Sequence, residues 1–249
     1  MQLLDSNAPT ELQRHADDVR RRLAAAIPNP KVELDFTTPW QLLVATILAA
    51  QSTDKKINEV TPVLFARYPG PKELAEADLE EVMVIVKPTG FFREKAKRIV
   101  GAAQAVHERF GGTVPKTLQR IMTLPGVARK TGNVVIGSAY GIATGMVVDT
   151  HVSRVAARLE LTTATDPVAI EEELITLFPK RSWVKASHQL VLHGRYVCQA
   201  KKPRCEMCPL NEICGSRRAP PRVRGWKRRA EWERALVESK GATDSAQAG

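Results

Sequence analysis

Four cysteines near the C-terminal end of the chain carry the clearest chemistry in the sequence. They are Cys198, Cys205, Cys208 and Cys214, in the spacing C-x6-C-x2-C-x5-C. Four thiolates within so short a segment can close on one centre without help from distant chain, and they suit either zinc or a [4Fe–4S] cluster. A zinc site usually joins a C-x2-C pair to a second such pair or to histidines. Because the chain has one such pair, we favour the iron–sulfur cluster over zinc.

A second candidate site is the segment Leu124-Pro-Gly-Val-Ala-Arg-Lys130. We expect a helix over residues 117–124, stopped by Pro125-Gly126, and a second helix that starts at once. The apolar face of the first helix would contain Leu118, Ile121, Met122 and Leu124. The first N–H groups of the second helix lack partners within the helix and carry the positive end of its dipole, so they suit a phosphate. Arg129 and Lys130 add full positive charge there.

These two groups together resemble one known family. The hairpin, followed by Val148-Asp149-Thr150-His151, is similar to the helix-hairpin-helix element of the endonuclease III family of DNA glycosylases. The cysteine spacing, preceded by His193-Gly-Arg-Tyr196, resembles the cluster loop of that family. The resemblance extends over about residues 12–214. It implies an all-α fold with two helical lobes and a C-terminal [4Fe–4S] loop.

The resemblance also implies where the lobes and the catalytic groups lie. Residues 33–143 would form a six-helix lobe with the hairpin, and residues 1–32 plus 144–216 a cluster lobe. Lys130 would be the nucleophile and Asp149 its catalytic partner. An amine must be unprotonated to attack, and both the helix start and the neighbouring Arg129 disfavour an ammonium. Asp149 is also well placed to be the N-cap of the helix that follows it, and both roles can hold at once.

Excision of a base from duplex DNA requires extrusion of the nucleotide, so the gap has to be filled. The resemblance assigns this wedge role to Gln51, in Leu48-Ala-Ala-Gln51, and to Phe91, which is larger than the aliphatic residue often found in the family. Ala49 replaces the usual serine, and Ala128 replaces the usual glycine of the hairpin. The expected contacts to the DNA backbone come from the hairpin and from the basic cluster loop: Gly126, Ala128, Arg129, Lys201, Lys202 and Arg204.

Composition supports a polyanionic partner. The 249 residues carry 37 Lys and Arg against 27 Asp and Glu, a net charge of +10, which favours nucleic acid over a membrane. No stretch of about 18 apolar residues is present, so we expect no membrane association. Early acidic residues such as Asp5 and Glu11 are unlike a targeting peptide, which indicates a cytoplasmic protein. The segment 217–249 is expected to be a basic, flexible tail, either a DNA-contacting arm or simply solvated.

Apolar residues recur at helical spacing nearly throughout the chain, and no two segments alternate apolar and polar residues as paired strands would. This pattern independently predicts an all-α class. Helix starts are marked by Asp78, Asp166 and Thr38. Thr38 is followed by Pro39 at the first helical position and by Gln41, which is placed to complete a capping box.

The sequence therefore predicts a base excision repair enzyme. It would act as a monomer on double-stranded DNA containing a damaged base or an abasic site, remove oxidised pyrimidines and cleave the abasic site by β-elimination. One alternative is an adenine-mismatch glycosylase, although that relative lacks the nucleophilic lysine and has an additional C-terminal domain. Another alternative is a DNA-binding module that uses the hairpin and the cluster loop without catalysis.

Overall fold

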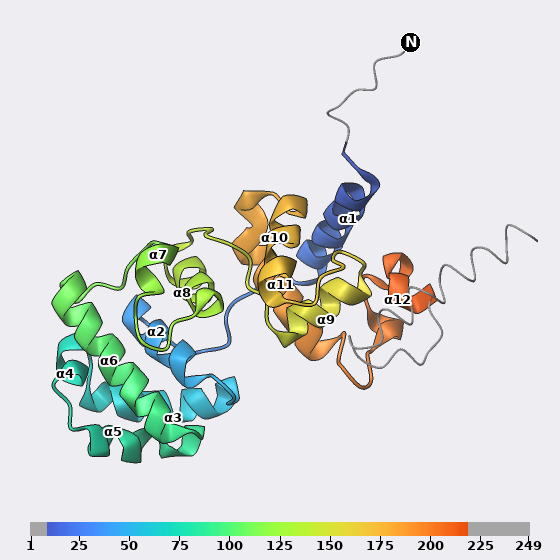
Figure 1. Ribbon diagram of the computed structural model, residues 1–249. Helices are drawn as coiled ribbons and strands as arrows, with labels where there is room; N and C mark the ends of the chain where they lie inside the picture. The colour runs from blue at the N-terminus through green and yellow to red at the C-terminus, as the bar shows by residue number, and fades with distance from the viewer. Residues whose placement is uncertain (1–8, 219–249) are drawn as a thin grey trace, which may run out of the picture. The chain divides into compact units, whose positions relative to one another are not determined.

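The computed structural model describes residues 9–218. Within that range all regular secondary structure is helical, so the expected all-α class is confirmed (Figure 1). The chain divides into two compact units. One contains Lys31–Gly145, and the other joins the described residues up to Pro30 to those from Met146 onward. The lobe limits expected from the sequence, 32/33 and 143/144, lie beside these two division points.

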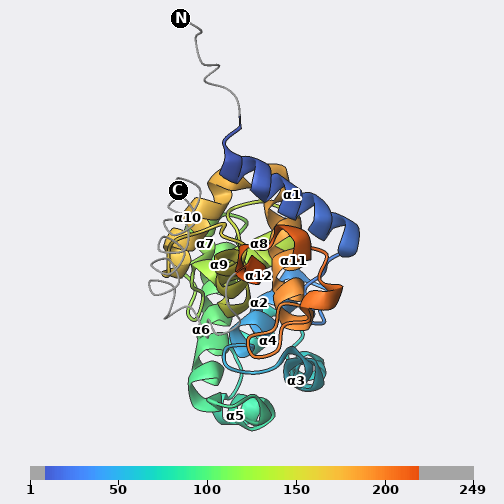
Figure 2. The same ribbon diagram turned by 90° about the vertical axis from the view of Figure 1, so that its right-hand side faces the viewer.

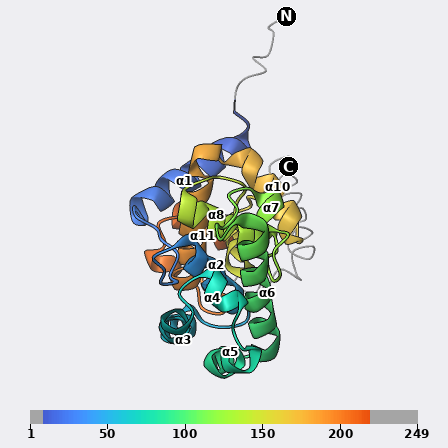
Figure 3. The same cartoon turned by 90° about the vertical axis from the view of Figure 1, so that its left-hand side faces the viewer.

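The unit of residues 31–145 is organised around α2, whose apolar side chains are buried on nearly every side. A helix of this composition has no face to offer to water, so other helices must cover it. The long helix α6 and the helix α8 pack on α2, and α6 also runs past α4 and α5 (Figure 3). The elements of this unit are α2 (Pro39–Leu48), α3 (Asp54–Arg67), α4 (Pro71–Ala75), α5 (Leu79–Val86), η1 (Lys87–Thr89), α6 (Phe92–Phe110), α7 (Leu118–Ile121) and α8 (Arg129–Tyr140).

The start of α2 is capped as expected in one respect and differently in another. The Thr38 hydroxyl accepts a hydrogen bond from the backbone N–H of Gln41 at 3.2 Å, with Pro39 at the first helical position. The predicted capping box is wrong, because the Gln41 side chain does not return to the N–H of Thr38. Its Oε1 accepts instead from the backbone N–H and the hydroxyl of Thr37, both at 2.8 Å. Two donors on one residue outcompete the single N–H of Thr38.

The helix before the hairpin is shorter than predicted. The chain was expected to be helical over 117–124, but α7 covers only Leu118–Ile121. Leu118, Ile121 and Leu124 are buried, whereas Met122 is 42% exposed and does not belong to the apolar face. Residues 122–124 continue as turns, in which the N–H of Leu124 donates to the carbonyl of Ile121 at 3.1 Å.

In the other unit α1 lies beside α10 and α11 (Figure 2), and α9 packs on α11. The buried core of this unit contains Leu23, Val152, Leu174 and Leu190. Asp166 caps α10 as predicted, accepting from the N–H groups of the next turn. The elements are α1 (Glu11–Ala26), α9 (Thr150–Arg158), α10 (Pro167–Leu177), η2 (Lys180–Ser182), α11 (Trp183–Tyr196), η3 (Cys205–Met207), η4 (Asn211–Ile213) and α12 (Gly215–Arg218).

The predicted basic tail falls almost wholly outside the described residues. Only Arg217 and Arg218 are included, as the last residues of the short helix α12. Among the described residues, no helix combines the length and the apolar character that crossing a membrane requires.

Candidate active site and cluster loop

The hairpin before α8 depends on Gly126 for two reasons. Its φ of 77° lies in the left-handed region that favours glycine. A Cβ at this position would also come within 3.1 Å of Arg98 Cβ and 3.2 Å of Ile47 Cγ2, so the turn lies directly on α6 and α2. The backbone closes through the N–H of Val127, which donates to the Leu124 carbonyl at 3.2 Å. The hairpin is therefore held from two sides.

Helix α8 presents its first turn without a side-chain cap. Its N-cap residue is Ala128, whose φ of −87° and ψ of 173° are accessible to any residue, so the backbone does not require glycine here. The exposed side chain of Lys130 and the half-buried side chain of Arg129 occupy the first two helical positions. Two residues after Lys130, Gly132 faces inward, where an added Cβ would lie 2.8 Å from Leu118 Cδ1. The inward packing of Gly132 leaves Lys130 on the solvent side of the helix.

Asp149, at the start of α9, is held in a different way. Its Oδ1 accepts hydrogen bonds from the N–H groups of His151 and Val152, at 2.9 and 2.8 Å. The predicted N-cap is therefore confirmed, and the second carboxylate oxygen is not used for capping. Asp149 belongs to a different unit from Lys130. The link before it is anchored, since the N–H of Val147 donates to the hydroxyl of Ser187 at 2.9 Å.

Gln51 and Phe91, which sequence analysis assigned as wedge residues, share a feature that the sequence does not reveal. Both have left-handed backbones, with φ of 54° and 49°, and both side chains are exposed. Neither residue is glycine or asparagine, so each conformation costs free energy, and such backbones cluster at functional sites. They lie in the same unit as Lys130.

Two arginines that sequence reasoning missed connect α9 to the first cysteine. Arg154 donates from Nε to the Cys198 carbonyl at 3.1 Å and from Nη2 to the Gly194 carbonyl at 2.7 Å. Arg158 donates from Nη1 to Cys198 Sγ at 3.2 Å. Burial lowers the pKa of Arg154, and the nearby charge of Arg158 adds to this. The sequence held one indication of this contact: Arg154 and Arg158 are four residues apart, so they lie on the same face of the helix that follows Asp149.

Comparison with known proteins identifies the chain. The HhH-GPD superfamily of base excision DNA repair proteins matches residues 44–180, and the iron–sulfur binding domain of endonuclease III matches residues 198–214. The endonuclease III of Synechocystis sp. is 48% identical over 83% of this chain and 94% of that relative. The chain belongs to the endonuclease III family.

Other members of the family agree in sequence and in structure. The endonuclease III of Escherichia coli K12 is 36% identical over 79% of this chain and 93% of its own. An endonuclease III trapped as a covalent intermediate with DNA has a TM-score of 0.79 and 34% identity, over 83% of this chain and 97% of its own. This endonuclease III family member is thus a DNA glycosylase of base excision repair, from a family of glycosylases and abasic-site lyases.

The four cysteines suit the [4Fe–4S] cluster of the family, and the alternative of zinc is set aside. Cys198, Cys208 and Cys214 are half-buried and pack on the core of their unit. Burial raises the pKa of Cys208, a hydrogen bond from the Leu210 backbone lowers it, and the three other cysteines raise it further. No three or more His, Cys, Asp or Glu side chains in the described chain are spaced for a single metal ion. A four-iron cluster sets its thiolates farther apart than one ion does.

Two side chains that can donate hydrogen bonds lie beside the cysteine sulfur atoms. One is Arg158, on Cys198. The other is His193, which is 2% exposed and has Nε2 3.7 Å from Cys208 Sγ. Burial lowers the pKa of His193 to about 4, so its ring is neutral at neutral pH and one ring N–H can donate to sulfur. Donors to ligating sulfur atoms orient the ligands and tune an iron–sulfur centre.

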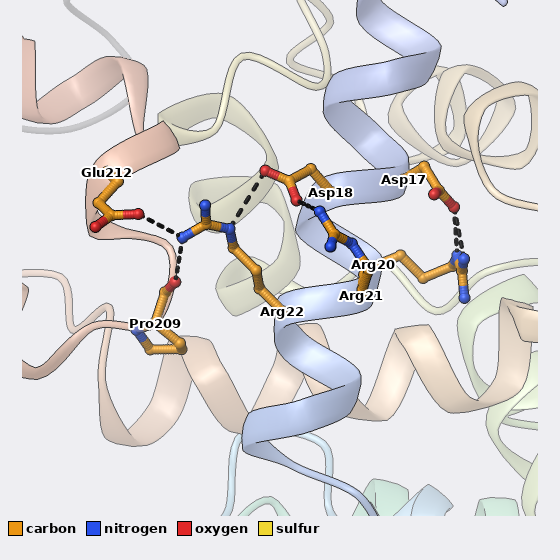
Figure 4. Close-up of polar contacts among 7 residues, drawn as sticks. All are labelled: Asp17, Asp18, Arg20, Arg21, Arg22, Pro209 and Glu212. Carbon is orange, nitrogen blue, oxygen red and sulfur yellow. Dashed lines mark hydrogen bonds and ion pairs between the residues drawn. The ribbon is translucent and has the colours of Figure 1, made fainter.

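The loop between the first two cysteines carries the exposed basic residues Lys201, Lys202 and Arg204. Its base is closed by the N–H of Arg204, which donates to the Val197 carbonyl at 2.9 Å. Helix α1 is tied to the later part of the loop through Arg22 (Figure 4), which donates to Glu212 Oε2 at 3.0 Å and to the Pro209 carbonyl at 3.4 Å. Exposed pairs of this kind add little stability, so they align the loop more than they strengthen it.

Proposed function

We propose that this endonuclease III family member removes oxidised pyrimidines from duplex DNA and then cleaves the abasic site that results. The observation that carries the proposal is the exposed Lys130 in the first turn of α8, directly after the hairpin. Support comes from the relative of 34% identity that was trapped as a covalent intermediate with DNA, since a covalent intermediate requires a nucleophile.

The target nucleotide leaves the base stack before reaction, because its sugar carbon is otherwise hidden. Gln51 and Phe91 then occupy the space that is vacated. Their exposed side chains and left-handed backbones support this assignment, since a wedge must project from a rigid corner. Phe91 offers a flat apolar ring that can stack on a base.

In the chemical step the lone pair of Lys130 Nζ attacks C1′ of the extruded sugar, and the bond from C1′ to the base breaks. The base leaves with that electron pair and takes up a proton. Asp149 receives the proton that the attacking amine sheds and offsets the positive charge developing on the sugar. Ring opening gives a Schiff base at C1′. Loss of a C2′ proton then expels the 3′ phosphate by β-elimination.

The DNA backbone is held by two separate groups. One is the hairpin with Gly126, Ala128 and Arg129, where uncapped N–H groups of α8 and a cation meet a phosphate. The other is the basic loop of Lys201, Lys202 and Arg204. The [4Fe–4S] cluster, when bound, fixes the fold of that loop. Removing the three loop charges together should reduce the salt dependence of DNA binding, by a slope of about 0.9 per lost phosphate contact.

We further infer that the enzyme acts as a monomer on damaged or abasic duplex DNA in the cytoplasm. The curated relatives reported above are bacterial, and their DNA is cytoplasmic, which supports the location. Sedimentation of the protein with and without an abasic duplex tests the stoichiometry; a dimer that persists at nanomolar concentration contradicts it.

The decisive experiment measures excision across a panel of duplexes, each with one damaged base. We expect release of oxidised pyrimidines, with little release of alkylated purines or of adenine opposite oxidised guanine. Borohydride should trap a covalent adduct on the same oxidised duplexes. Adenine release without an adduct would favour the mismatch glycosylase, and DNA binding without release or adduct would favour a binding module.

A further inference from the structure

Helix α6 contains a buried lysine that the proposed reaction does not use. Lys95 is 3% exposed and lies in the first turn of the helix. Burial lowers its pKa, and no carboxylate contributes to that shift. The first turn also carries the positive end of the helix dipole, which disfavours a cation. A methionine would fill the same volume without either penalty, so the ammonium calls for an explanation.

The contacts of Lys95 converge on the segment just before α6. Its Nζ donates to the backbone carbonyl of Thr89 at 2.7 Å, and its backbone N–H donates to the carbonyl of Phe91 at 3.1 Å. Thr89 is itself 3% exposed, and its hydroxyl donates to the Val86 carbonyl at 2.8 Å. Lys95 therefore binds the carbonyls of the residues on both sides of Gly90. One of these residues, Thr89, is itself buried and held by its own hydrogen bond to Val86.

The segment that Lys95 holds is a strained corner. Gly90 has a φ of 73° and Phe91 a φ of 49°, so two successive residues have positive φ. Phe91 is the N-cap of α6, yet no side chain caps the helix there. Its own side chain is 69% exposed. A non-glycine residue keeps such a backbone only where its surroundings fix it.

We propose that Lys95 is a positioning residue that fixes the Phe91 corner, so that the Phe91 ring is already projected when the enzyme meets DNA. The inference rests on the proposed function, because it takes Phe91 to be a wedge. The ammonium orients the Thr89 carbonyl and thereby sets the direction in which the chain enters Gly90. A fixed ring loses less conformational freedom on binding than a mobile one.

The test uses the holoenzyme and a duplex with a tetrahydrofuran abasic analogue, with 2-aminopurine as the opposing base. At saturating enzyme, insertion of the wedge should change the 2-aminopurine fluorescence. We expect Phe91→Ala to lose most of this change and Lys95→Met to lose at least half, each with about 5- to 10-fold weaker binding. The control is Lys97→Met, an exposed lysine of the same helix paired with Glu94, which should behave as wild type.

Two further readouts separate positioning from general stability. Replacing a buried ammonium by an apolar chain should leave the Tm unchanged or raised, even though the wedge signal falls. In a Phe91→Ala background, Lys95→Met should cause no additional loss of DNA affinity, because there is no ring left to position. An additive loss, or a lowered Tm with a full fluorescence change at saturation, overturns the proposal.

The outcomes also distinguish this inference from the proposed function. If Phe91→Ala retains the full signal and affinity, Phe91 is not a wedge, and both fall together. If Phe91→Ala loses the signal while Lys95→Met keeps it, only the role of Lys95 is refuted. Should Lys95→Met fail to fold, Lys95→Gln replaces it in the same comparison, since its amide is one bond too short to reach Thr89 as the ammonium does.

Discussion

The starts of α8 and α9 lie 21 residues apart in the sequence and are built in opposite ways. At α8 the N-cap is Ala128, whose side chain has no atom that could accept from the first N–H groups, and Arg129 and Lys130 occupy the first turn. At α9 the carboxylate of Asp149 accepts from two N–H groups. A side-chain cap typically adds ~1 kcal/mol to the stability of the folded protein, so α9 has a stabilising contribution that α8 lacks.

The difference shows how helix ends can be assigned to different tasks. The uncapped and basic start of α8 keeps N–H donors and positive charge for a ligand outside the protein, which suits a phosphate. The capped start of α9 uses its N–H groups to fix one carboxylate oxygen, so that the carboxylate is oriented before substrate arrives. In the function proposed above, the start of α8 would bind a phosphate and the start of α9 would hold the catalytic carboxylate.

The largest expected effect comes from removing the amine at the uncapped end. Lys130→Ala should abolish borohydride trapping and reduce strand cleavage at an abasic site by at least 10³-fold, because no other group there can form the Schiff base. The Tm should change little, since the side chain is exposed. Adduct formation by Lys72→Ala, an exposed lysine of the same unit, serves as the control. A Lys130→Ala enzyme that still gives an adduct would remove the nucleophile assignment.

The next effect separates the two roles of Asp149 at the capped end. Asn also accepts from backbone N–H groups, so Asp149→Asn should keep the Tm within about 1 °C, whereas Asp149→Ala should lose ~1 kcal/mol, or roughly 2–4 °C. Turnover on an oxidised-pyrimidine duplex should fall about 10²- to 10⁴-fold in both variants, since neither retains the carboxylate. Full activity of Asp149→Asn would show that capping is its whole role.

The caps were predictable from the sequence because capping is local. Asp78, Asp149 and Asp166 each accept from N–H groups two or three residues ahead, so the residue type and its position are sufficient. The helical class and the cysteine loop followed from pattern and spacing. The short extent of α7 did not, because the apolar spacing of Leu118, Ile121 and Leu124 is met equally well by a helix and by the turns that follow it.

The supporting groups of the site could not be predicted, because they act across long sequence distances or through the backbone. Arg154 and Arg158 reach the Cys198 loop from forty or more residues away. The left-handed backbones of Gln51 and Phe91 could not be predicted, because neither residue is a type that usually adopts a positive φ. From the sequence alone, Lys95 would be expected on the exposed charged face of an amphipathic helix, and only the structure shows that it is buried.

A smaller effect is expected when the start of α8 is made to resemble that of α9. Ala128→Asp supplies the missing cap and should raise stability by ~0.5–1 kcal/mol. The carboxylate would then compete with phosphate for the same N–H groups, so binding to an abasic duplex should weaken by about 10-fold. Thermal unfolding and fluorescence anisotropy on the same preparation measure both quantities. Ala128→Ser, a neutral cap, should stabilise with a smaller loss of affinity; equal losses would show that charge is not the cause.

The smallest effect is expected from Ala128→Gly, which restores the residue usual in the family. The backbone at Ala128 has an ordinary negative φ, so glycine relieves no strain there; because glycine is the better N-cap residue, stability should stay the same or rise by less than about 1 kcal/mol. Removing the methyl group allows a phosphate to approach the first N–H groups more closely. The Kd for abasic DNA should therefore tighten by up to about threefold or stay the same. A clear weakening would mean that the methyl group itself contacts DNA, and that the open start of α8 binds through packing as well as through its N–H donors.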